Sequence, residues 1–401
     1  MTSKIERRDF LLSLAAAAVA PSLLGATGES TFTAPVGRAL VLSGGGALGA
    51  YEAGIVGQLA AAGAVSDGTP LPGYQLIAGT SIGAINGWFV ATGQYQRLHD
   101  LWYGISGENP IRLKPQFAAL RDPESGILNL AASAISAIGL ARNEQGLLQN
   151  EPTFAWLSRH IDPATPALVP LIWAVTNLRE QRPEYFFIRP SNAGEELPKH
   201  VVRALQFTLG PQTVVREATP DILQRAIFAS TALPVAFDPV MMPDPNGMLV
   251  PYCDGGVASN SPVGIAHAMA SAADVVLLDP PFEPQTDYKD ALEIAFAAFG
   301  TMQRKILEEE MRTAYFQSVG KRTFSRLTPQ QGVGAASGNE PLLHYFHSVP
   351  ATELRYIRPQ TALPLGVVSF NDEVGIGKAY RQGWLDAGRG FTPYDWETFE
   401  L

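Results

Sequence analysis

One short segment, Gly79-Thr80-Ser81-Ile82-Gly83, constrains the fold of this chain more than any other. The strand-like run 74–78 before it predicts a strand, and the helix-like run 84–90 after it predicts a helix. A serine flanked by two nearby glycines, placed between a strand and a helix, is typical of the sharp turn called a nucleophile elbow. We therefore expect the two glycines to make room for the turn, and Ser81 to project its hydroxyl at the top of a sheet.

A second glycine-rich segment begins earlier in the chain. The predicted strand 39–42 leads into Ser43-Gly44-Gly45-Gly46-Ala47-Leu48-Gly49, and a helical pattern follows. Consecutive glycines allow backbone N–H groups to converge on one point, because no Cβ atom stands in the way. Such donors suit a phosphate or the oxyanion of an acyl-transfer intermediate.

The same glycines allow other interpretations. Gly44, Gly46 and Gly49 spell the G-x-G-x-x-G pattern of dinucleotide-binding proteins, which predicts a nicotinamide-dependent oxidoreductase. That pattern expects an acidic residue at the end of the next strand, where this chain has Thr80 and Ser81 instead. A P-loop is disfavoured because no Gly-Lys-Ser/Thr follows the glycines. A plain strand-to-helix turn without a ligand is the remaining alternative.

A third segment supplies a carboxylate. A short apolar run leads to Asp254-Gly255-Gly256, followed by Asn260-Ser261-Pro262. Asp-Gly-Gly alone is a common turn. Together with the other two segments, however, it completes the set that an acyl-transfer site needs: a nucleophile, a base and oxyanion donors.

These three segments, in this order, resemble the patatin-like phospholipase family. The resemblance spans about residues 39–279 and includes the segment 229–240 before the aspartate. It implies an α/β fold, a three-layer α/β/α sandwich with a mostly parallel central sheet. It also implies a Ser–Asp dyad hydrolase that needs no cofactor: Ser81 attacks the acyl carbonyl, Asp254 accepts the proton, and Gly44, Gly45 and Gly46 form the oxyanion loop. The implied partner is a lipid or another acyl ester, with transient contact to a membrane surface. A non-enzymatic lipid-binding protein on the same scaffold is the third functional alternative.

Two positions depart from the family pattern. Ser43 stands where many members carry aspartate, and Leu48 stands where many carry arginine or lysine. A cation at the second position would help to hold a negative intermediate. Neither change removes the backbone N–H donors of the glycine-rich segment, so we expect activity.

Histidine and cysteine offer less persuasive candidates. His267 follows Asp254 in the chain, which is the order of an ordinary Ser-Asp-His triad. It lies within a helical pattern, so we expect a helix-surface residue. Cys253, the only cysteine, is predicted to be a buried packing thiol. We find no spacing of side chains that is typical of a metal site.

The first residues predict export. Arg7-Arg8 precede an uncharged run from Leu11 to Leu24, which is typical of a twin-arginine signal and short for a membrane span. Cleavage would follow either Ala20 or Ala26. We expect a signal peptide and linker over residues 1–34 and a periplasmic or secreted protein.

Composition and pattern set the domain organisation. Hydrophobic residues make up 46% of the chain, enough for a large core, and the formal net charge of −9 argues against nucleic acid as a partner. We predict an acyl hydrolase domain over residues 35–285. Residues 286–401 should form a helical and mixed extension that packs on the same domain and includes an amphipathic helix over 288–319. The sequence does not predict the oligomeric state.

Overall fold

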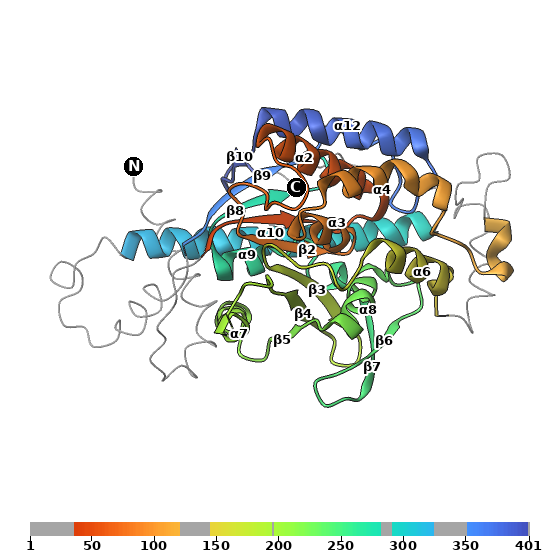
Figure 1. Ribbon diagram of the computed structural model, residues 1–401, viewed down its shortest axis with the longest axis horizontal. Helices are drawn as coiled ribbons and strands as arrows, with labels where there is room; N and C mark the ends of the chain where they lie inside the picture. Colours follow the sequence, from red (N-terminus) through yellow and green to blue (C-terminus); the bar gives the residue numbers. More distant parts are fainter. Residues whose placement is uncertain (1–35, 121–144, 195, 282–290, 325–350, 400–401) are drawn as a thin grey trace.

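A central sheet organises the chain. The computed structural model describes residues 36–120, 145–194, 196–281, 291–324 and 351–399. Within these ranges the sheet has ten strands in the order β10-β9-β8-β1-β2-β3-β4-β5, and β7 joins β6 to β3 (Figure 1). The strands are β1 (Val36–Leu42), β2 (Leu76–Thr80), β3 (Leu171–Asn177), β4 (Arg182–Ile188), β5 (Val214–Glu217), β6 (Val240–Pro243), β7 (Leu249–Asp254), β8 (Ala270–Val276), β9 (Glu353–Ile357) and β10 (Thr392–Pro393).

Most neighbouring strands run parallel. The five strands from β9 through β8, β1 and β2 to β3 all point the same way, so their carboxyl ends share one edge of the sheet. The strands β4 and β7 both run antiparallel to β3. Ligand sites in such sheets lie outside the carboxyl ends of the strands, and Ser81 directly follows β2 at that edge.

Helices cover both faces of the sheet. One face carries α2 (Gly49–Ala62), α3 (Ile82–Ala91), α4 (Tyr95–Glu108), α6 (Asn150–His160), α8 (Pro220–Thr231) and α12 (Glu373–Arg389). The other face carries α7 (Glu196–Leu209), α9 (Val263–Met269) and α10 (Ala291–Phe324). Short 3₁₀ helices are η2 (Gly46–Leu48), η3 (Pro115–Leu120) and η5 (Gly255–Val257).

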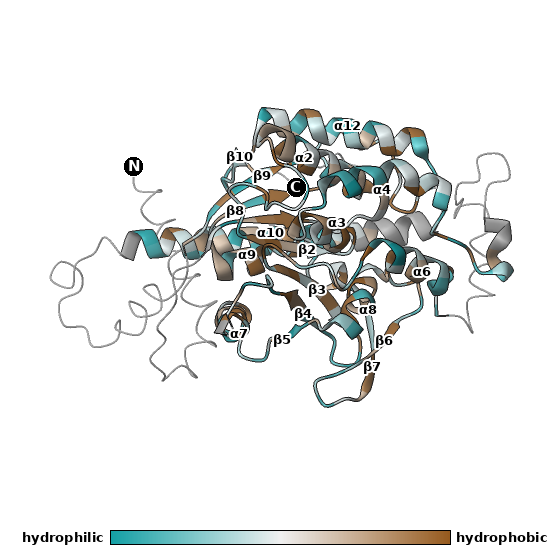
Figure 2. Cartoon of the chain, viewed as in Figure 1, coloured by the Kyte–Doolittle hydropathy of each residue, from teal (hydrophilic) through white to brown (hydrophobic). Residues whose placement is uncertain are grey.

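Side-chain alternation in β1 separates the two cores. Leu40 and Leu42 belong to the apolar cluster on the α2 side, whereas Ala39 and Val41 belong to the cluster on the α10 side. Successive side chains of a strand point to opposite faces, so this strand is apolar on both. Figure 2 shows the central strands in brown, the colour of hydrophobic residues. The predicted three-layer α/β/α sandwich is therefore confirmed.

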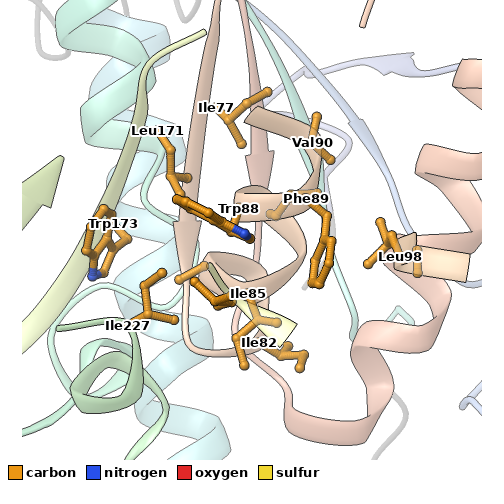
Figure 3. Packing of buried hydrophobic residues seen from close by; sticks show 14 of the residues in the cluster. Ile77, Ile82, Ile85, Trp88, Phe89, Val90, Leu98, Leu171, Trp173 and Ile227 are labelled. Carbon is orange, nitrogen blue, oxygen red and sulfur yellow. The ribbon is translucent and has the colours of Figure 1, made fainter. Parts of the chain in front are cut away.

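The helix that follows the elbow is buried on all sides. Every residue of α3 is buried, and Trp88 and Phe89 are among the largest fully enclosed side chains. Figure 3 shows the helix between Leu171 and Trp173 of β3 on one side and Leu98 of α4 on the other. Dense packing around α3 fixes the position of the turn that precedes it.

Several boundaries differ from the sequence predictions. The strand before the elbow is β2 and begins at Leu76, two residues later than predicted. The amphipathic helix is α10, which runs to Phe324.

The predicted signal peptide lies outside the described residues. No helix in the described ranges is long and apolar enough to span a bilayer.

Candidate active site

The turn between β2 and α3 has the geometry of a nucleophile elbow. Ser81 has φ 53° and ψ −124°, a backbone conformation that is unfavourable for a residue with a side chain. A Cβ atom at Gly79 would collide with the carbonyl oxygen of Gly83, and one at Gly83 would collide with the carbonyl oxygen of Leu42. The two glycines therefore permit the close approach that the turn needs, as predicted.

Ser81 and Asp254 meet in space, although 173 residues separate them in the chain. Ser81 Oγ donates a hydrogen bond to Asp254 Oδ2 at 2.6 Å. The Gly256 N–H donates to Asp254 Oδ1, also at 2.6 Å, and so fixes the carboxylate from its other side. Both residues are buried, with Asp254 only 3% exposed.

Burial changes the acidity of this carboxyl. Removal from water raises the pKa of Asp254 to about 7, although the hydrogen bonds from Ser81 and Gly256 oppose part of the change. A base whose pKa lies near neutral pH accepts a proton more readily than an ordinary aspartate and is still ionised in a large fraction of molecules. The arrangement therefore suits proton transfer from the serine hydroxyl.

The glycine-rich loop offers fewer donors than the sequence predicted. The Gly44 N–H donates to the Asn260 carbonyl oxygen at 2.9 Å, and the Ala47 N–H donates to the Val367 carbonyl oxygen at 2.8 Å. Within the described residues, the N–H groups of Gly45 and Gly46 donate no hydrogen bond. The oxyanion prediction for Gly44 therefore needs correction: its donor is already occupied, because that hydrogen bond ties the loop to the segment after Asp254.

The other motif glycines serve close packing. A Cβ atom at Gly49, the first residue of α2, would collide with Ile82. One at Gly255 would collide with the carbonyl oxygen of Ala174. At Gly256, a Cβ atom would crowd Asn260 and Gln303 as well as Asp254. These glycines thus let the glycine-rich loop approach the elbow, and the aspartate segment approach β3 and α10.

Two side-chain amides join these segments. Asn260 Nδ2 donates to the Gly44 carbonyl oxygen at 3.3 Å, and Gln303 Nε2 donates to Asn260 Oδ1 at 3.2 Å and to the Gly256 carbonyl oxygen at 3.3 Å. Both amides also line a pocket beside Gly44. Gln303 is not predictable from the sequence as a site residue, because it lies on α10 and no local pattern connects it with the site.

A second contact from α10 reaches the elbow. Glu310 Oε1 accepts a hydrogen bond from Ser259 Oγ at 2.7 Å, and the Ser259 carbonyl oxygen accepts one from Thr80 Oγ1 at 2.8 Å. Thr80 directly precedes Ser81. The helix α10 therefore supports both the aspartate segment and the serine turn.

The two departures from the family pattern have structural roles. Ser43 Oγ donates to the Val276 carbonyl oxygen at 2.6 Å and lies 2.5 Å from Ser261 Oγ, so it links β1 to β8. Leu48 packs against the apolar core. Neither side chain brings a charge to the site.

A buried glutamate lies beneath the glycine-rich loop. Glu52 is fully buried, and Asn86 Nδ2 donates to its Oε2 at 2.9 Å. Asn86 also donates to the Gly49 carbonyl oxygen and accepts from Trp102 Nε1, both at 3.0 Å. Burial raises the pKa of Glu52 to about 8, so this carboxyl is mostly protonated at neutral pH.

The prediction that His267 lies on a helix surface is wrong. The side chain is 1% exposed, because α9 is enclosed between the sheet and α10. Its Nδ1 lies 3.1 Å from Thr352 Oγ1 and its Nε2 lies 2.6 Å from Gln317 Oε1, so both ring nitrogens are engaged away from Ser81. Burial lowers the pKa of His267 to about 4 and keeps the ring neutral.

Cys253 is buried, as predicted. Burial and the neighbouring Asp254 raise the pKa of its thiol to about 12, which disfavours the reactive thiolate. Within the described ranges, no group of three or more His, Cys, Asp or Glu side chains is placed to hold a metal ion.

Comparison with known proteins identifies the family. The family model described as patatin-like phospholipase matches residues 40–267, more than half of the chain. The chain therefore belongs to the patatin-like phospholipase family. No curated protein sequence matched it. The crystal structure of VipD from Legionella pneumophila aligns with 90% of this chain and 69% of its own, at 14% sequence identity and a TM-score of 0.34.

Proposed function

We propose that this protein is a serine acyl hydrolase that cleaves carboxylic esters of lipids through Ser81 and Asp254. The observation that carries the proposal is the 2.6 Å hydrogen bond from Ser81 Oγ to Asp254 Oδ2 in a strained turn. Family membership supports a lipid substrate in general terms. It also favours acyl hydrolysis over the dinucleotide-dependent chemistry that the glycine pattern allows.

The first half of the reaction forms an acyl-enzyme. Ser81 Oγ attacks the carbonyl carbon of the ester while Asp254 accepts the hydroxyl proton. The carbonyl oxygen becomes an oxyanion and receives hydrogen bonds from the Gly45 and Gly46 N–H groups. The intermediate collapses, the C–O bond to the alcohol breaks, and the proton on Asp254 passes to the departing alkoxide.

The second half regenerates the serine. A water molecule gives a proton to Asp254 and attacks the acyl carbon, and the same N–H groups again receive the oxyanion. The Ser81 ester then breaks, and Ser81 takes back the proton. A fatty acid and the free enzyme result, and no cofactor enters the scheme.

Hydrolysis of a p-nitrophenyl acyl ester tests this proposal. The wild-type protein should release nitrophenol with turnover, and Ser81→Ala should reduce the rate by at least about 10³-fold. Tight NAD binding without ester turnover would instead support the oxidoreductase alternative, and lipid binding without turnover would support the non-enzymatic one. A panel of glycerolipids would then define the head group and the chain length.

Export is a separate part of the proposal. Arg7 and Arg8 with the uncharged run after them support passage through a twin-arginine pathway. Cell fractionation of the wild type and of an Arg7→Lys/Arg8→Lys variant tests it. The wild type should leave the cytoplasm and the variant should remain there.

A further inference from the structure

A two-stranded ribbon projects from the edge of the sheet that carries Ser81. β7 runs antiparallel to β3, and Tyr252 pairs with Asn177, the last residue of β3. The first residues of β7 therefore extend beyond the carboxyl end of β3, and β6 accompanies them (Figure 1). Leu249 stands five residues from Asp254, which places it about 16 Å further out at ~3.3 Å per residue.

Both faces of this ribbon are apolar. On the inner face Met242 and Val250 are paired and buried, each 1% exposed. On the outer face Met241 is 46% exposed and Leu249 is 61% exposed. A ribbon with one solvated face normally alternates apolar with polar residues, so this outer face has the composition of a surface that becomes covered.

Two further apolar residues extend the exposed surface. Met248, just before β7, is 52% exposed, and Leu178, just after β3, is 37% exposed. The Leu178 N–H donates to the Pro251 carbonyl oxygen at 3.0 Å, so the two segments lie side by side. We call Leu178, Met241, Met248 and Leu249 the apolar tip; Figure 2 shows brown segments at the end of the ribbon.

Several backbone groups in the turn between β6 and β7 already form hydrogen bonds within the turn. The Asp244 carboxylate accepts hydrogen bonds from the N–H groups of Asn246 and Met248 at 2.8 and 2.9 Å. The Met248 carbonyl oxygen accepts one from the Asp244 N–H at 2.8 Å. Satisfied backbone groups lower the cost of moving a segment out of water.

Charges of both signs border the apolar tip. Arg179 forms an ion pair with Glu180 at 3.9 Å beside Leu178 and also contacts Met248 Sδ. Arg216 Nη1 donates to the Pro243 carbonyl oxygen at 2.7 Å, and Asp244 adds a second carboxylate. The border thus has no excess of positive charge, and the chain as a whole has a net charge of −9. A strongly anionic surface is therefore a poor match, whereas zwitterionic head groups, which carry both signs, are a good one.

We propose that the apolar tip inserts into the surface of a zwitterionic lipid bilayer and turns the catalytic edge toward it. The biological use of this contact rests on the proposed lipid hydrolysis. Insertion by about 5–10 Å is typical of interfacial segments and would leave Asp254 about 6–11 Å from the acyl boundary. A membrane-bound ester could then reach Ser81 by rising partly out of the bilayer. Unbranched methionine side chains adapt to such a fluid surface.

Vesicle binding tests the proposal without depending on catalysis. The full-length Ser81→Ala protein is mixed with phosphatidylcholine vesicles, and the bound fraction is measured by co-sedimentation. We expect binding that persists in about 0.5 M salt, because apolar insertion is not screened. Adding Met248→Ser and Leu249→Ser should weaken binding by about tenfold or more, since both side chains lose their apolar burial.

A matched control uses two similarly exposed apolar residues far from the ribbon. Val374 and Leu385 on α12 are 65% and 51% exposed, and α12 lies at the opposite side of the molecule (Figure 1). The Val374→Ser/Leu385→Ser variant should bind vesicles as the parent does, and thermal melting should show both variants folded. As a second measurement, Leu249→Trp should give a blue-shifted emission on vesicle addition.

Three outcomes would overturn the proposal. The first is that the Ser81→Ala parent does not bind vesicles, and the second is that the α12 control loses as much binding as the tip variant. The third is that the protein forms a dimer that the tip substitutions dissociate, because the apolar tip would then be covered by a second copy of the chain. Failure of the proposed hydrolysis would appear separately, as a wild-type protein that binds vesicles but does not cleave ester.

Discussion

Asp254 and Glu52 are both buried carboxyl groups, and they differ in what they contact. Asp254 is 3% exposed and Glu52 is fully buried, and burial raises the pKa of the first to about 7 and of the second to about 8. Asp254 accepts a hydrogen bond from the Ser81 hydroxyl, whereas Glu52 accepts one from the Asn86 amide. Only the first partner has an oxygen that can act as a nucleophile after losing its proton. A raised pKa alone therefore does not define a catalytic base; the identity and placement of the hydrogen-bond donor do.

Matched amide substitutions give the largest expected difference. Asp254→Asn removes the proposed base but keeps the shape of the side chain, so kcat for ester hydrolysis should fall by at least about 10³-fold. Glu52→Gln resembles the protonated form already present and should keep kcat within about fivefold. Steady-state kinetics on both variants measure the contrast. Equal losses of kcat in the two variants would contradict a catalytic role that belongs to Asp254 and not to Glu52.

The pH dependence of the wild type should follow Asp254. The group must be ionised to accept a proton, so kcat/KM should rise with pH through a midpoint near 7 and fall about tenfold for each pH unit below it. Glu52→Gln should leave that midpoint in place. A midpoint near 4, or one that moves in the Glu52 variant, would contradict the assignment.

The contribution of Asp254 to folding stability should fall as the pH rises, whereas its contribution to activity should increase. Because the folded-state pKa of Asp254 is raised, its carboxyl stabilises the folded state fully below about pH 4 and loses that contribution as the pH rises through about 7. Asp254→Asn removes the cost of burying the charge, so the free energy of unfolding at pH 8 should increase by up to about 4 kcal/mol. The gain should vanish toward pH 4. Urea denaturation at several pH values tests this, and a gain independent of pH would argue against it.

The amides that join the segments should show the smallest effect. Asn260→Ala frees the Gly44 carbonyl oxygen and loosens the loop that presents Gly45 and Gly46, so kcat should fall about tenfold while KM stays within about twofold. Asn192→Ala, in an exposed surface loop, is the matched control and should change neither value. A rise in KM without a fall in kcat would point to substrate binding instead.

Local features were predictable where local sterics decide them. The elbow follows from glycines two residues before and after Ser81, since only small residues fit there. The start of β8 at Ala270 is harder to predict, because the alanine-rich segment after α9 suits a helix as well as a tightly packed strand. The burial of His267 and the bond between Gly256 and Gln303 were not predictable. Each depends on a residue of α10 that lies about 50 residues further along the chain. Such contacts leave no periodic signal in the sequence.

Covalent labelling by a fluorophosphonate is the most direct test of the central claim that Asp254 activates Ser81 for attack. Intact-protein and peptide mass spectrometry should find one adduct, on Ser81. Asp254→Asn should slow labelling by at least about 10²-fold, whereas Glu52→Gln should label at close to the wild-type rate. An adduct on another residue, or labelling of Ser81 at an undiminished rate without Asp254, would contradict the account.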